Sequence, residues 1–152
     1  MKFASLPSKN PKNRNGDLIV VSKDLKKGVR VESKIATSLL NALENWSEVS
    51  PQLKTISEAL NLGKAADAFD LNLKECLAPI THAPGFLDGS AFLSHVVRAR
   101  KARGDVMPES ARKTPLMYQG VSDNLLSAYS PIELMDEAYG GDIEGEIAAI
   151  ML

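Results

Sequence analysis

The pattern of apolar and polar positions predicts short strands at the start of the chain. Residues 10–17 are rich in Asn, Pro, Lys and Gly, which is typical of turns. The apolar, β-branched run Leu18-Ile19-Val20-Val21-Ser22 then predicts a buried strand. Alternation in Gly28-Val29-Arg30-Val31-Glu32 predicts a second strand. We therefore expect the first thirty residues to form short strands joined by turns.

A change of hydrophobic period then predicts a helix. Large apolar residues recur at three- and four-residue spacing, at Leu39, Leu40, Leu43 and Trp46. This spacing places them on one helical face, so we expect a helix over residues 37–49 with Trp46 in the core.

A second helix is predicted directly after the first. Ser50 suits an N-cap and Pro51 suits the first helical position. Another apolar stripe follows at helical spacing, at Leu53, Ile56 and Leu60. Gly63 stands where a C-terminal glycine cap belongs. The two helices should meet at a sharp corner near Ser50.

The rest of the chain is more broken in pattern. Small and polar residues predict a linker over residues 64–71, and we expect a domain boundary near it, giving domains 1–75 and 76–152. A helix is expected over 91–103, followed by a proline-punctuated loop and irregular structure. After the breaker Gly140-Gly141, alternation predicts a strand over 142–152.

Composition excludes several classes of protein. The net charge is −1, from 18 basic and 19 acidic residues, which argues against a nucleic-acid or anionic-membrane partner. The single cysteine, Cys76, excludes an internal disulfide and a Cys-rich zinc site, and we interpret it as a small buried apolar residue. No stretch approaches the roughly 20 apolar residues of a membrane span. We expect a soluble cytoplasmic protein of α+β class.

Three acids alternate in the last predicted strand. Asp142, Glu144 and Glu146 should share one face, with neighbours about 7 Å apart. Carboxylates this close repel unless they are solvated, protonated or bridged by a cation. The face is therefore either the exposed edge of a strand or a site for a hard cation such as Mg²⁺ or Ca²⁺.

Two further features carry candidate chemistry. His95 follows Asp88 by seven residues, which is two turns of a helix, and a histidine near a carboxylate is a common general-base arrangement. A lone histidine is also common at surfaces and in cores. A basic cluster follows, made of Arg98, Arg100, Lys101, Arg103, Arg112 and Lys113. It is short and has no interleaved aromatics, so it is a solvated helix face or a site for a substrate carboxylate rather than a nucleic-acid surface.

Taken together, these segments resemble the fumarylacetoacetate hydrolase family, in its bacterial fumarylacetoacetase-like branch. The stretches that carry the resemblance are Phe86-Leu87-Asp88-Gly89-Ser90-Ala91-Phe92-Leu93-Ser94-His95, Arg100-Lys101-Ala102-Arg103-Gly104, Pro115-Leu116-Met117-Tyr118-Gln119-Gly120 and Asp142-Ile143-Glu144-Gly145-Glu146. Their order and spacing also agree, and the likeness covers most of the chain. The first part resembles the small N-terminal domain of that branch.

The resemblance implies a role for each matched residue. Asp88, Glu144 and Glu146 correspond to metal-binding carboxylates for Mg²⁺ or Ca²⁺, and His95 to the histidine that activates water. Tyr118 and Ser90 correspond to substrate-binding positions. Arg103, with Arg100 as the alternative, corresponds to the arginine that binds the substrate carboxylate. His82 is assigned no catalytic role.

The resemblance also implies an activity and an architecture. Members hydrolyse a carbon–carbon bond in β-diketo acids, and fumarylacetoacetate, an intermediate of tyrosine breakdown, is the substrate of the type enzyme. The expected fold is a small domain of strands and two helices, then the start of a mixed, β-sandwich-like catalytic domain. The family's fourth metal-binding aspartate and later catalytic residues have no counterpart before Leu152. We therefore expect a truncated N-terminal portion, inactive alone, of an enzyme that is a homodimer at full length.

Two alternatives remain open at this point. The parent enzyme could be a family relative that decarboxylates oxaloacetate or isomerises a keto acid with the same metal and enolate chemistry. The chain could also be a non-enzymatic fragment or an interaction module.

Overall fold

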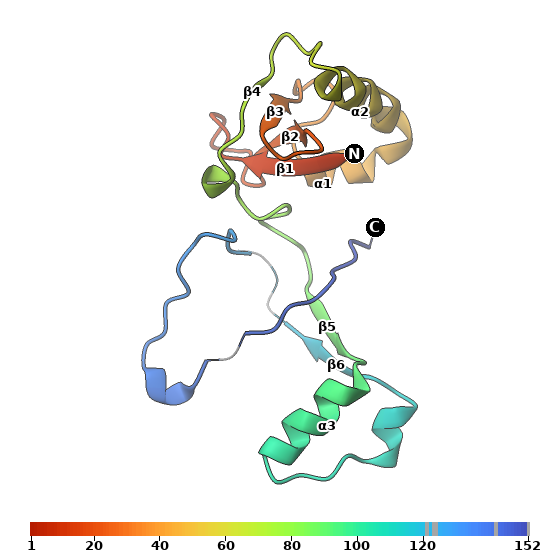
Figure 1. The fold of residues 1–152 in the computed structure, drawn as a ribbon, viewed down its shortest axis with the longest axis vertical. Helices are drawn as coiled ribbons and strands as arrows, with labels where there is room; N and C mark the ends of the chain where they lie inside the picture. The colour runs from red at the N-terminus through yellow and green to blue at the C-terminus, as the bar shows by residue number, and fades with distance from the viewer. Residues whose placement is uncertain (121, 123–124, 142, 152) are drawn as a thin grey trace. The chain divides into compact units, whose positions relative to one another are not determined.

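A computed structural model describes residues 1–120, 122, 125–141 and 143–151. The fold is α+β, as the sequence predicts, with helices and antiparallel strands in the described residues. The chain divides into two compact units, Met1–Thr81 with Leu125–Leu152, and His82–Asn124 (Figure 1).

The first unit is built on a four-stranded antiparallel sheet. Its strands are β1 (Lys2–Leu6), β2 (Asp17–Val21), β3 (Lys27–Arg30) and β4 (Phe69–Asp70), in that order. Leu18, Ile19 and Val20 on β2 are fully buried. An unbroken apolar run suits a strand that is covered on both faces. Both strands predicted for the first thirty residues are confirmed.

Strand β4 corrects the linker predicted for residues 64–71. Phe69 pairs with Gly28, and Asp70 pairs with Lys27, on β3. A Cβ at Gly28 would lie 3.0 Å from the Phe69 ring and 2.8 Å from Ile19, so the ring occupies space that only a glycine leaves open. A single aromatic residue in a small, polar stretch gives too little periodicity to predict this pairing.

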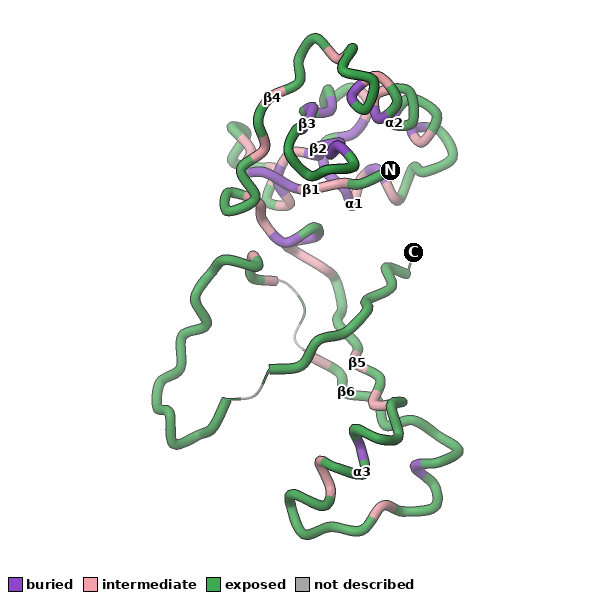
Figure 2. Tube along the Cα trace, viewed as in Figure 1, coloured by how far each residue is buried: buried purple, intermediate pink, exposed green. Residues whose placement is uncertain are grey.

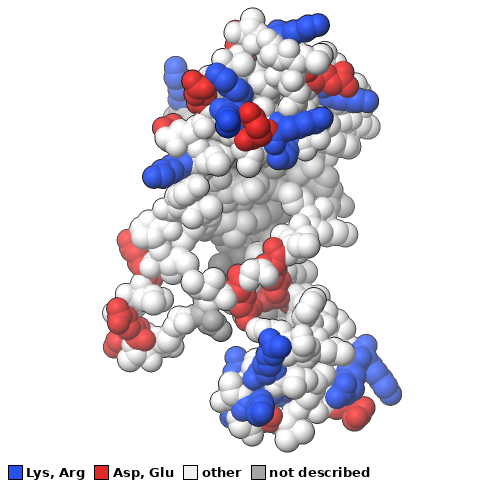
Figure 3. Space-filling model, in the orientation of Figure 1, with Lys and Arg blue, Asp and Glu red and all other residues white. Residues whose placement is uncertain are grey.

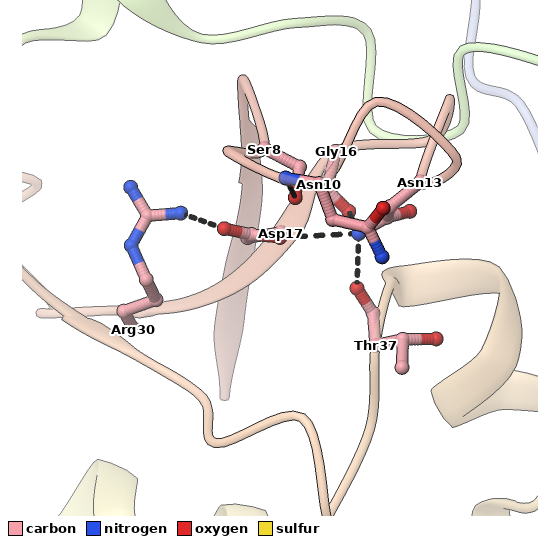
Figure 4. Close-up of polar contacts among 7 residues, drawn as sticks. All are labelled: Ser8, Asn10, Asn13, Gly16, Asp17, Arg30 and Thr37. Carbon is pink, nitrogen blue, oxygen red and sulfur yellow. Dashed lines mark hydrogen bonds and ion pairs between the residues drawn. The ribbon is translucent and has the colours of Figure 1, made fainter.

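The turn between β1 and β2 is fixed by the side chain of Asn13. Its amide Nδ2 donates to the Gly16 carbonyl at 2.9 Å, to Asp17 Oδ1 at 3.1 Å and to the Thr37 carbonyl at 2.7 Å (Figure 4). Asp17 also pairs with Arg30 on β3. Gly16 has a φ of 76°, which glycine adopts without strain. The predicted turn is confirmed.

The two helices of this unit meet at Asn45 rather than at Ser50. Helix α1 (Leu39–Glu44) begins after Ser38, whose side chain accepts from the Asn41 N–H, and α2 (Trp46–Asn61) contains Pro51. The Asn45 side chain donates to the Asn41 carbonyl at 2.9 Å, and its backbone leaves the helical region. This local bond competes with helix continuation, so the corner forms five residues before the predicted one.

Trp46 is the second correction in the helices. It begins α2 with 38% of its surface exposed, and its ring meets Phe3 edge to face at a centroid distance of 6.1 Å. The core positions of the two helices are instead Leu39, Ala42, Val49, Leu53 and Leu60. Moving the corner to Asn45 rotates Trp46 away from the apolar stripe.

Helix α2 ends in the glycine cap that the sequence predicts. Gly63 has a φ of 67°, and its N–H donates to the Leu60 carbonyl at 3.1 Å. The next N–H, of Lys64, donates to the Ala59 carbonyl at 2.9 Å. These two bonds satisfy carbonyls that the last helical turn leaves open.

The chain after β4 packs back on the first unit. The Leu77 N–H donates to the Ser5 carbonyl at 2.9 Å, and Ser5 Oγ donates to the Pro79 carbonyl at 2.7 Å. Cys76 is half-buried against the apolar cluster of Leu6, Ile19 and Val21 on β1 and β2. Burial raises the pKa of its thiol, in agreement with a packing role.

The second unit is smaller and more thinly packed. Strands β5 (Leu87–Ser90) and β6 (Leu116–Gln119) form an antiparallel pair, and helix α3 (Leu93–Ala102) lies between them in sequence. Among its described residues, Val96 and Ala111 are the buried side chains (Figure 2). The helix predicted for 91–103 is confirmed, whereas β6 lies in the stretch expected to be irregular.

The strand predicted over 142–152 is not formed in the described residues 143–151. Asp142 and Leu152 lie outside the described residues. A strand requires a neighbour to take its backbone hydrogen bonds, and no pairing among the described residues involves this segment. No helix in the part of the chain that the structure describes has the length and apolar character needed to cross a membrane.

Candidate active site

The hairpin of β5 and β6 brings three of the implied site residues onto one face. Asp88 lies directly opposite Tyr118, and Ser90 lies opposite Leu116. Opposed residues of an antiparallel pair point to the same side, as do residues two apart on a strand. Asp88, Ser90 and Tyr118 therefore share a face, on which Asp88 and Ser90 are half-buried and Tyr118 is exposed.

Glycine at position 120 is needed where the hairpin continues beyond β6. The Gly120 N–H donates to the Phe86 carbonyl at 2.9 Å. A Cβ at Gly120 would lie 2.6 Å from the Phe86 ring and 3.3 Å from the Tyr118 ring. Both rings thus close over the glycine, which helps to place Tyr118. Sequence reasoning did not identify this role, although Gly120 stands in the quoted Pro115–Gly120 stretch.

The structure changes the expected relation between Asp88 and His95. Asp88 is on a strand, and His95 is an exposed residue in the first turn of α3, so their spacing of seven does not place them on one helical face. Pairing with β6 keeps residues 87–90 extended, and the helix begins only at Leu93. His82 lies in the loop before β5 and is half-buried.

Helix α3 divides the basic cluster into two faces. Arg100 and Arg103 follow the buried Val96 by four and seven positions, so they lie on its side of the helix. Arg98 and Lys101 lie on the opposite, exposed side. Arg100 is half-buried and Arg103 ends the helix. Cations in the last helical turn are also favoured by the helix dipole, which gives Arg100 and Lys101 a structural role.

Glu144 and Glu146 can be tested as a pair for binding a hard cation. Both are exposed, and one carboxylate oxygen of each lies within 4.8 Å of the other. Two oxygens on one Ca²⁺ lie at most about 4.8 Å apart, and on one Mg²⁺ at most about 4.2 Å. The pair therefore falls within the limit for a shared Ca²⁺, even though the segment forms no strand.

The third implied ligand belongs to the other unit. Asp88 is on β5 in the unit His82–Asn124, whereas Glu144 and Glu146 belong to the unit that begins at Met1. The convergence of Asp88 with the two glutamates accordingly stays a prediction.

The comparison with protein families identifies the first unit. Residues 1–81 match the family model described as fumarylacetoacetase N-terminal domain 2, which covers more than half of the chain. The matched range contains the four-stranded sheet, both of its helices and the segment that packs back on β1. A search of curated proteins finds no match. The chain therefore belongs to the fumarylacetoacetase family, with the family's N-terminal domain in its residues 1–81.

Proposed function

We propose that this chain forms part of the active site of a metal-dependent hydrolase that cleaves a carbon–carbon bond in a β-diketo acid of the fumarylacetoacetate or acylpyruvate type. The observation that carries the proposal is the match of residues 1–81 to the fumarylacetoacetase N-terminal domain. The grouping of Asp88, Ser90 and Tyr118 on one hairpin face supports it, because two separate stretches that resemble the family, Phe86–His95 and Pro115–Gly120, contribute to that face.

Asp88, Glu144 and Glu146 are the proposed ligands of Mg²⁺ or Ca²⁺. Their all-oxygen chemistry suits a hard cation, and the spacing of the two glutamates fits one. When bound, the cation would polarise the oxygens of the enolised keto-acid part of the substrate.

His95 is the proposed general base. Its imidazole takes a proton from water as the water oxygen adds to the second carbonyl carbon of the substrate. The carbon–carbon bond then breaks, and its electron pair passes to the keto-acid part as an enolate that takes up a proton. The products are a carboxylic acid and a keto acid, so atoms and charge balance without an oxidant or a reductant.

Arg100 or Arg103 is the proposed partner of the substrate carboxylate. A guanidinium holds a carboxylate through two parallel hydrogen bonds, and both residues lie on the Val96 side of α3. Tyr118 and Ser90 would add hydroxyl contacts from the hairpin face. The small-molecule diketo acid is thus the proposed partner, and we propose a homodimer for the full-length form.

The test is complementation with the C-terminal part of a family enzyme. We expect hydrolysis of fumarylacetoacetate only when the chain and that part are mixed in the presence of Mg²⁺ or Ca²⁺. Turnover of oxaloacetate without hydrolysis of fumarylacetoacetate would favour a decarboxylase. A stable mixture that is inactive on both substrates would contradict the proposal and favour an interaction module.

A further inference from the structure

The hairpin loop between β2 and β3 holds a leucine in a backbone conformation that favours glycine. Leu25 has a φ of 65°. Among the described residues, it is the one residue other than glycine that has a positive φ. Its N–H donates to the Ser22 carbonyl at 3.1 Å, so a tight turn precedes it. Loops of this kind commonly carry glycine at this position. A strained residue at a surface suggests that its side chain has a use.

The loop is fastened at several points, so the strained conformation is maintained. Ser22 Oγ donates to Asp24 Oδ1 at 2.6 Å, and the same oxygen accepts from the Lys26 N–H at 3.1 Å. The Lys23 N–H donates to Asn61 Oδ1 at the end of α2, at 2.9 Å. Lys2 Nζ donates to the Lys23 carbonyl at 2.7 Å. These bonds join the loop to the start of β1 and the end of α2.

The segments that these bonds join carry exposed apolar and basic side chains. Met1 precedes Lys2, and Leu62 follows Asn61. The apolar side chains of Met1, Leu25 and Leu62 are 52%, 41% and 68% exposed. The surrounding cations are Lys2, Lys23, Lys26 and Lys64, all exposed. We call these seven residues the Leu25 surface. Figure 3 shows Lys and Arg side chains, with Asp and Glu among them, over the part of this unit that residues 1–81 form.

Carboxylates near the Leu25 surface already have partners. Asp24 accepts from Ser22 and Lys26, and these hydrogen bonds lower the pKa of its carboxyl. Asp70 pairs with Lys27 at 2.7 Å. Asp24 stays ionised, but four lysines outnumber it, so the surface offers apolar contacts surrounded by net positive charge, which fits an acidic and apolar partner.

Residues 132–139 have that complementary chemistry. The segment reads Ile132-Glu133-Leu134-Met135-Asp136-Glu137-Ala138-Tyr139, and no Lys or Arg occurs after Lys113. All eight residues are exposed, and Met135 and Tyr139 are 99% and 83% exposed. We call residues 132–139 the acidic segment.

We propose that the Leu25 surface of one copy binds the acidic segment of a second copy. Leu25, Met1 and Leu62 would cover the apolar side chains of the segment, and the four lysines would face Glu133, Asp136 and Glu137. Burial of the exposed apolar side chains favours association, and the charges give it direction. None of these residues belongs to the proposed metal centre, so this proposal and the proposed function can fail separately.

Sedimentation velocity over a range of protein and salt concentrations tests the proposal. The wild-type chain should dimerise, with a dissociation constant that rises with ionic strength. Leu25→Gly should raise that constant at least about tenfold without unfolding the chain, because glycine accepts the φ of position 25. Lys54→Glu, on the exposed side of α2, is the matched charge control and should change it little.

Charge exchange makes the test specific for two copies. Lys23→Glu/Lys26→Glu and Glu133→Lys/Glu137→Lys should each be monomeric alone, because like charges then face one another. An equimolar mixture of the two variants should form a heterodimer, since each surface again meets the opposite charge. A wild-type chain that stays monomeric at all concentrations, as internal docking would give, overturns the proposal. So does dimerisation that survives both Leu25→Gly and Lys23→Glu/Lys26→Glu.

Discussion

At the scale of single residues, the proposed chemistry depends most directly on His95. The side chain is exposed at the start of α3, where water and a substrate can reach it. Histidine is the side chain that most often serves as a general base in enzymes. The other histidine, His82, lies before β5 and has no proposed role.

The two histidines give a matched pair of substitutions. In the complemented enzyme, His95→Ala should lower kcat at least about 10²-fold and leave metal affinity nearly unchanged, because it removes a base and not a ligand. His82→Ala should be nearly silent. Both values should be measured per folded molecule, together with thermal melts. Full kcat in the folded fraction of His95→Ala would show that His95 is not the general base.

Leu25 gives a second prediction at this scale. A leucine in the left-handed region costs about 1–2 kcal/mol relative to glycine, which is offset in part by the extra freedom of glycine in the unfolded chain. Leu25→Gly should therefore raise the free energy of unfolding by up to about 1 kcal/mol, and Leu25→Val should lower it. Urea unfolding of both variants measures this. Destabilisation by glycine would mean that side-chain packing outweighs backbone strain at Leu25.

At the scale of elements, the ends of the helices are set by local hydrogen bonds. Gly63 closes α2 and Gly104 closes α3, with φ of 67° and 78°. In both helices the residue after the glycine donates back to the last turn, Lys64 to Ala59 and Asp105 to Arg100. Both helices therefore end in the same glycine cap, although the first unit buries many more side chains than the second.

Replacement of Gly63 measures how much such a cap contributes to the free energy of unfolding. Apart from its chain neighbours, no atom of the described residues lies within 4 Å of a Cβ built at Gly63, so a side chain there meets backbone strain without a clash. Gly63→Ala should lower the free energy of unfolding by about 1 kcal/mol, and Gly63→Asn by less, because asparagine tolerates this region better. Chemical denaturation monitored by circular dichroism checks both. Equal losses for alanine and asparagine would argue against strain as the cause.

Elements with strong local signals could be predicted, and those that depend on distant partners could not. The apolar run of β2 and the glycine after α2 carry their own signals. The pairing of Phe69 with Gly28 could not be predicted from the sequence, since it depends on the space beside a residue 41 positions away. The corner at Asn45 depends on one hydrogen bond, from the Asn45 side-chain amide to the Asn41 carbonyl, which competes with the helical pattern.

The candidate site shows the same division. Motifs identified Asp88, Ser90 and Tyr118, but their shared face follows from a strand pairing that the sequence did not predict. The spacing of Asp88 and His95 suggested that both lie on one helical face, but Asp88 lies on β5 and the helix begins only at Leu93. The boundary between domains 1–75 and 76–152 stays a prediction.

At the scale of the whole molecule, the two units should differ in stability. In the first, β2 and α2 enclose fully buried side chains such as Leu18 and Leu53. In the second, Val96 and Ala111 are the buried side chains among the described residues, and a two-stranded sheet is marginal alone. Amides of β2 should therefore exchange with deuterium far more slowly than those of β5, β6 and α3. Equal protection in both units, measured by NMR, would contradict this.

The metal centre is the central claim, and paramagnetic relaxation tests it without requiring activity. Mn²⁺ replaces Mg²⁺ or Ca²⁺ at oxygen sites and broadens nearby amide resonances even when binding is weak. Substoichiometric Mn²⁺ should broaden Asp88 together with Glu144 and Glu146. The effect should vanish in Glu144→Gln/Glu146→Gln and persist in the control Glu133→Gln/Glu137→Gln. Broadening that leaves Asp88 unaffected, or that is equal at all acidic residues, would contradict the proposed centre.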